Sequence, residues 1–123
     1  MADPRIEKLA DVLVNYSTSV QPGEWVGILG DVAALPMVRA VYRKVLEAGG
    51  NPSLFVTDET MRREFIRAAS DAQFEWLDPA MTLYYEQADV YIRVGTVSNT
   101  RAMTHVPAER IQKFQKGQSA WLE

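Results

Sequence analysis

The sequence of 123 residues contains no cysteine and only one histidine, His105. Without cysteine the chain cannot form a disulfide framework, a thiolate zinc site, an iron–sulfur cluster or a cysteine nucleophile. A site that needs two imidazoles could form only if an oligomer supplied the second one. Several classes of catalytic and metal site are therefore excluded before any fold is considered.

An excess of positive charge and long apolar runs are missing as well. The sequence contains 13 Lys and Arg and 16 Asp and Glu, which gives a formal net charge of −3. We therefore predict no nucleic-acid partner, since nucleic-acid-binding domains normally show a basic face. No apolar run approaches the roughly 18 residues of a membrane span, so we expect no membrane partner. Residues 1–5 include Asp3 and no apolar stretch, which is unlike a signal peptide and favours a cytoplasmic protein.

The sequence does contain enough apolar surface for one core. Hydrophobic residues make up 47% of the chain, including 3 Trp, 5 Tyr and 4 Phe. Disorder is not expected at this composition. The length is that of one ordinary domain, so we expect residues 1–123 to form a single α/β domain.

The first predicted element is an amphipathic helix over residues 3–19. Asp3 followed by Pro4 is a typical start signal for a helix. Apolar residues then recur at spacings of three, four and three, which places them on one helical face: Ile6, Leu9, Leu13 and Tyr16. Residues 21–24 break the chain, and the short apolar run 25–30 predicts a strand that is buried on both faces.

A strand–helix–strand unit is predicted next. Asp31 is expected to cap a helix that ends at Gly49 and Gly50, and residues 53–57 follow as a second strand. The apolar positions of this helix keep a helical period: Leu35, Val38, Val41, Tyr42, Val45 and Leu46.

The rest of the chain continues the alternation of helices and strands. We expect two or three short helices between Thr60 and Gln87, a third strand over residues 88–95 and a last helix that begins at Pro107. This order predicts a three-layer αβα, Rossmann- or flavodoxin-like fold. Its small parallel sheet has three strands in the order 2-1-3, with at least one open edge.

The carboxyl ends of the three strands form the candidate ligand cleft, because ligands bind there in doubly wound folds. These ends are residues 30–31, 57–59 and 95–100. Asp58 could face a ligand, or it could cap the following helix. Asn99 and Arg101 could bind an anionic group, or they could be part of a turn that is followed by a surface charge. His105 could equally be a solvated loop residue.

Binding of a nucleotide phosphate at the first strand is not favoured. The dinucleotide fingerprint needs three glycines in the pattern G-x-G-x-x-G, whereas this loop has only Gly27 and Gly30. Asp31 stands where the phosphate would lie, and its carboxylate would repel an anion. The segment is more typical of a helix cap after a buried strand.

The succession of segments resembles the N-terminal region of the aminopeptidase T family of metallopeptidases. The resemblance rests on the opening helix 3–17, the segment 20–26, the long helix that ends at residues 47–52 with the strand after it, and the stretch 106–116 with its Pro-Ala-Glu-Arg start. It covers nearly all of this chain but only about the first third of a family member.

The resemblance implies a full-length enzyme that removes N-terminal residues from peptides. It implies two divalent metal ions, of zinc, cobalt or magnesium, held by Glu, His and Asp of a C-terminal catalytic domain that this chain lacks. This chain would bind no metal and be inactive alone. It would wall the active-site cavity, with Asp58, Asn99 and Arg101 as substrate-cavity candidates. Its partners would be the missing catalytic domain, a second copy in a homodimer and the peptide substrate.

Two alternatives without enzymatic activity remain open at this point. One is a stand-alone α/β module that binds a small ligand such as a nucleotide. The other is an interaction module that dimerises through its sheet edge or through the aromatic helices around residues 76–85.

Overall fold

The structure is a computed structural model that describes residues 3–95 and Lys116. The chain divides into two compact units, and each is described by itself. The described part of the first unit comprises residues 3–57 and 88–95, and that of the second comprises residues 58–87 together with Lys116. The predicted last helix from Pro107 lies outside the described residues.

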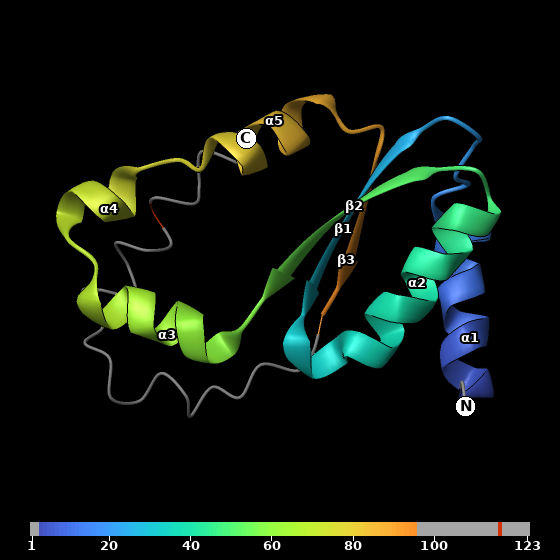
Figure 1. The fold of residues 1–123 in the computed structure, drawn as a ribbon, viewed down its shortest axis with the longest axis horizontal. Helices are drawn as coiled ribbons and strands as arrows, with labels where there is room; N and C mark the ends of the chain where they lie inside the picture. Colours follow the sequence, from blue (N-terminus) through green and yellow to red (C-terminus); the bar gives the residue numbers. More distant parts are fainter. Residues whose placement is uncertain (1–2, 96–115, 117–123) are drawn as a thin grey trace. The chain divides into compact units, whose positions relative to one another are not determined.

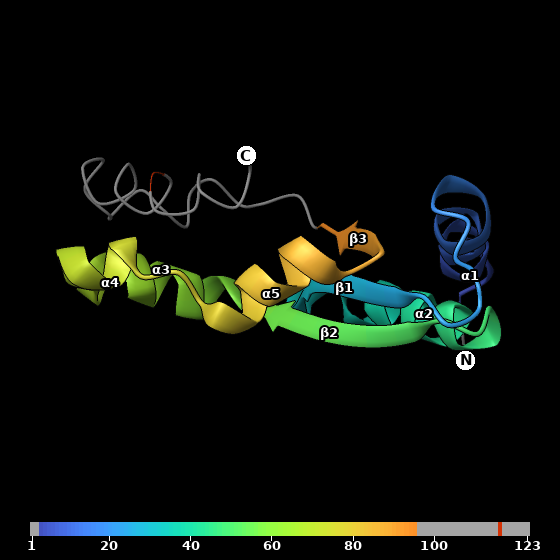
Figure 2. The same cartoon turned by 90° about the horizontal axis from the view of Figure 1, so that it is seen from above.

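The first unit is built on a parallel sheet of three strands (Figure 1). The strands are β1 (Trp25–Asp31), β2 (Asn51–Thr57) and β3 (Val90–Val94), and they pair in the order β2-β1-β3. Figure 2 shows β1 between its two neighbours. The predicted α/β fold with the strand order 2-1-3 is therefore confirmed.

The opening helix starts as predicted and then changes its geometry. In α1 (Pro4–Asp11), the Asp3 carboxylate accepts a hydrogen bond from the Arg5 N–H at 2.9 Å and so caps the helix. The chain continues as a π-helix, η1 (Val12–Ser17). The helix therefore reaches Ser17, two residues short of the predicted end.

The predicted apolar stripe of the opening helix is partly wrong. Ile6 and Leu13 pack against the core as expected, but Leu9 is 50% exposed and Tyr16 is 73% exposed. Two small residues four positions apart, Ala10 and Val14, are buried in their place. The i→i+5 bonding widens the turn over Val12–Ser17, so the 3.6-residue period does not extend to Tyr16.

The second helix packs closely on β1. Asp31 caps a short 3₁₀ turn, η2 (Val32–Ala34), through a hydrogen bond from the Ala33 N–H, and this turn leads into α2 (Leu35–Glu47). A Cβ on Gly30 would lie 2.4 Å from Val38 Cγ2, so only glycine allows this approach. Gly49 follows the end of this helix, and its φ of 86° favours glycine.

The core of the first unit lies between the sheet and these two helices. The strand residues of this core lie on one face of β1 and β3: Val26, Ile28, Ile92 and Val94. They pack against helix residues of α1, η1 and α2: Ala10, Val14, Val38, Val41 and Val45. Tyr42 and Leu46 were predicted in the same stripe of α2 but are exposed, so the buried stripe is narrower than the sequence pattern.

Residues 58–87 of the second unit form three short helices, and the sequence predicted two or three. They are α3 (Glu59–Ala68), α4 (Asp71–Glu75) and α5 (Pro79–Gln87). Asp58, Ser70 and Asp78 accept backbone hydrogen bonds at their starts, so the polar residues that punctuate this stretch are helix caps. None of the described helices is long and apolar enough to cross a membrane.

Candidate functional site

Asp31 and Thr57 meet at the carboxyl ends of β1 and β2. They are direct partners in the strand register, and the Thr57 Oγ1 lies 3.4 Å from Asp31 Oδ2 and 3.3 Å from the Gly30 carbonyl oxygen. The other carboxylate oxygen of Asp31 accepts the Ala33 N–H at 2.9 Å. The sequence therefore correctly placed the ends of these two strands side by side, and both oxygens of Asp31 have polar partners there.

Asp58 follows Thr57 directly and caps α3. Its Oδ1 accepts a hydrogen bond from the Thr60 N–H at 2.8 Å, and its carbonyl oxygen accepts the Arg62 N–H at 2.9 Å. Of the two sequence interpretations of Asp58, the helix cap is confirmed. Its role in a substrate cavity stays a prediction.

The other predicted cavity residues, Asn99 and Arg101, lie outside the described residues, and so does His105. The third loop of the predicted cleft, residues 95–100, is described only at Gly95. The site can therefore be built from the first two strand ends alone.

The charge at the helix starts disfavours an anionic ligand. Asp31 and Asp58 each place a carboxylate on the N–H groups of a helical start, which is where a phosphate would otherwise bind. The structure thus agrees with the sequence in giving no support to a phosphate site on the β1 loop.

The described residues do not fit a metal centre. Among residues 3–95 and Lys116, there is no group of three or more His, Cys, Asp or Glu side chains that could hold an ion. A catalytic zinc ion usually takes three protein ligands, and a pair of ions needs more. A two-ion site of the kind implied by the resemblance therefore cannot be assembled from this part of the chain.

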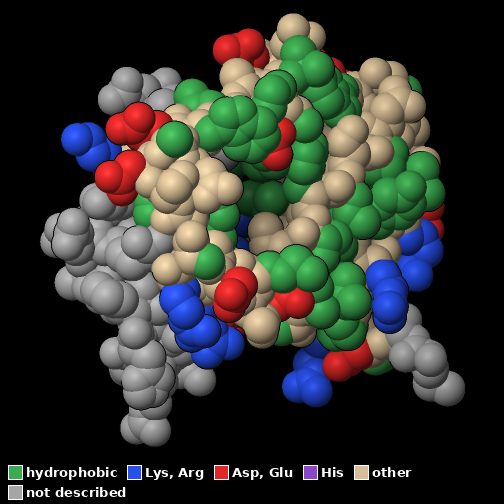
Figure 3. All heavy atoms as spheres, turned by 60° about the vertical axis from the view of Figure 1, so that its left-hand side comes forward, with side chains coloured by type: hydrophobic (Ala, Val, Ile, Leu, Met, Phe, Trp, Pro, Cys, Tyr) green, Lys and Arg blue, Asp and Glu red, His purple; other side chains and the backbone are tan. Residues whose placement is uncertain are grey.

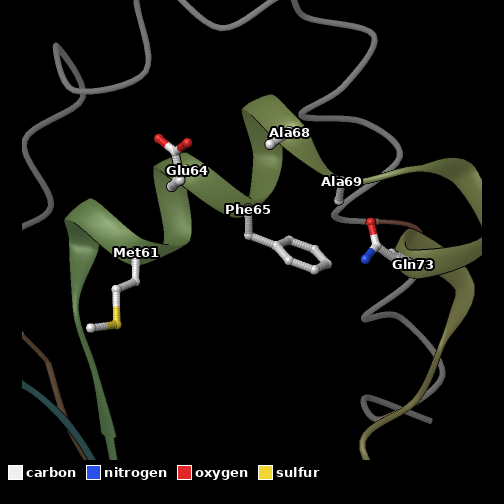
Figure 4. Close-up of a pocket in the computed structure, with 6 residues that line it drawn as sticks. All are labelled: Met61, Glu64, Phe65, Ala68, Ala69 and Gln73. Carbon is white, nitrogen blue, oxygen red and sulfur yellow. The ribbon is translucent and has the colours of Figure 1, made fainter.

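The second unit contains a hollow that the sequence analysis did not predict. It has a volume of about 390 Å³ and lies beside α3 and the start of α4 (Figure 4), lined by Met61, Glu64, Phe65, Ala68, Ala69 and Gln73. The i, i+4 spacing of Met61 and Phe65 was the available sequence signal.

Both polar side chains of this hollow already have partners within their own helices. Glu64 pairs with Arg67 at 3.6 Å, and Gln73 Oε1 accepts the Ser70 N–H at 2.8 Å. The ring of Phe65 also meets Phe74 edge-on at 5.5 Å. Among the described residues that line the hollow there is no acid–base pair, so these side chains offer packing surface rather than a reactive site.

Comparison with known proteins relates this chain to a protein family and to a solved structure. Residues 2–123 match the family described as thermophilic metalloprotease (M29). The solved structure of wild-type AmpT from Thermus thermophilus is similar to this chain, with a TM-score of 0.76 and 20% sequence identity. The similarity covers 95% of this chain but only 31% of AmpT. No curated protein sequence matches the chain.

Proposed function

Because this chain belongs to the M29 family of thermophilic metalloproteases, we propose that it is a non-catalytic, N-terminal domain of a metal-dependent aminopeptidase. The parent enzyme would remove N-terminal residues from peptides. In this proposal the chain helps to wall the active-site cavity and forms subunit contacts, and the catalytic domain that follows it holds the metal ions.

One contrast carries the proposal. The family match spans nearly the whole chain, yet residues 3–95 and Lys116 contain no cluster of metal-ligating side chains. The sequence supplies one histidine and no cysteine. The chain also spans only 31% of AmpT, which leaves most of such an enzyme to provide the ligands.

The division of labour follows from the chemistry of peptide hydrolysis. Divalent ions of zinc, cobalt or magnesium, when bound in the catalytic domain, would polarise the scissile carbonyl and lower the pKa of a bound water. This chain would contribute shape and polar contacts around the peptide. Exclusion of bulk water by such walls strengthens the electrostatic interactions inside a cavity.

Asp58 is the described residue that we assign to the cavity wall. The Thr60 N–H holds its Oδ1 in place at 2.8 Å and so orients the carboxylate, and in this proposal Oδ2 would accept a hydrogen bond from the peptide. The amino terminus of a peptide is a cation with several N–H donors, and a carboxylate suits it. Asn99 and Arg101 are assigned to the same wall by their place after β3, where the peptide's carbonyl and carboxylate oxygens would be their partners.

A peptidase assay tests the non-catalytic role. The 123-residue chain is incubated with aminoacyl chromogenic substrates in the presence of zinc, cobalt or magnesium, and AmpT serves as the positive control. We expect no release of the N-terminal residue by this chain under conditions in which AmpT is active. Metal-dependent release by the purified chain, abolished by a chelator and restored by added metal, would contradict the proposal.

A further inference from the structure

We draw no further inference here: the strongest candidate, the apolar hollow that Met61, Phe65 and Ala68 line beside α3 and the start of α4, is one of many places where hydrophobic side chains lie at the surface (Figure 3), and nothing in the described residues shows what covers it.

Discussion

Substitution of Gly30 by alanine tests the packing of α2 on β1, on which the shape of the candidate cleft depends. Gly30 is the last residue of β1 before Asp31, and a Cβ there would lie 2.4 Å from Val38 Cγ2. Carbon atoms pack best about 3.5–4.0 Å apart. Val38 is 2% exposed and β-branched, so it has one strongly preferred rotamer in a helix and cannot swing aside.

Two opposing terms set the size of the effect. Overpacking of a core costs about 1–3 kcal/mol. Replacement of glycine by alanine also reduces the backbone freedom of the unfolded chain, which stabilises the folded state by about 0.4–1 kcal/mol. At the midpoints of these ranges the overpacking cost is the larger, so we expect Gly30→Ala to lower the free energy of unfolding by about 1.3 kcal/mol.

A double-mutant cycle with Val38→Ala separates this clash from a general effect. Val38→Ala alone removes two buried methyl groups and should cost about 1.6 kcal/mol plus a cavity contribution. In Gly30→Ala/Val38→Ala, the new methyl group occupies the space that Val38 Cγ2 leaves. The double variant should therefore be more stable than the sum of the single effects predicts, by at least about 1 kcal/mol.

The assay is unfolding in urea at one fixed protein concentration, followed by tryptophan fluorescence and circular dichroism. Trp25 lies at the start of β1 and reports on the first unit. The reasoning is refuted if Gly30→Ala is as stable as the wild-type chain. It is also refuted if the two substitutions add to within about 0.5 kcal/mol, which is the behaviour of independent sites.

Substitutions at three further positions have effects on stability that the same unfolding assay can measure. Asp58→Ala removes the carboxylate that caps α3 through Thr60 and should cost about 0.5–2 kcal/mol, whereas Asp58→Asn should cost little because asparagine caps equally well. Gly49→Ala should cost about 1 kcal/mol, because φ is 86° there and a Cβ would lie 3.1 Å from Pro22. Ser70→Ala removes the capping box of α4 and should cost about 1 kcal/mol. A stability equal to the wild type in any of the three alanine variants would contradict the corresponding account.

The elements that the sequence predicted well are those fixed by local chemistry. Asp3 and Asp31 cap helical starts where their side chains were expected to do so, because the capping hydrogen bond spans only two or three residues. The strand order also followed from the sequence, since a parallel strand–helix–strand unit leaves few arrangements.

The errors arose where tertiary packing decides which side of a helix is covered. Leu9 and Tyr16 fit the helical period yet are exposed, whereas the small residue Ala10 is buried. A hydrophobicity pattern ranks large apolar residues first, but close helix contact favours small ones. The π-helical turn at Val12–Ser17 was also invisible to a 3.6-residue template.

The candidate site was less predictable than the fold. The sequence brought the ends of β1 and β2 together correctly, as Asp31 and Thr57 show. For Asp58 the sequence allowed two roles, a ligand contact and a helix cap. The structure shows the cap, and the same carboxylate can do both. In the described residues, the fold brings together no group of three or more side chains that could hold a metal ion.

The metal content of the purified chain tests the central claim most directly. The chain is incubated with zinc, cobalt or magnesium, dialysed and analysed by elemental mass spectrometry, with AmpT treated in parallel. The account predicts a stoichiometry near zero for this chain, because the metal ligands belong to the catalytic domain. One or two ions retained per chain after dialysis would contradict it and would require a metal site within these 123 residues.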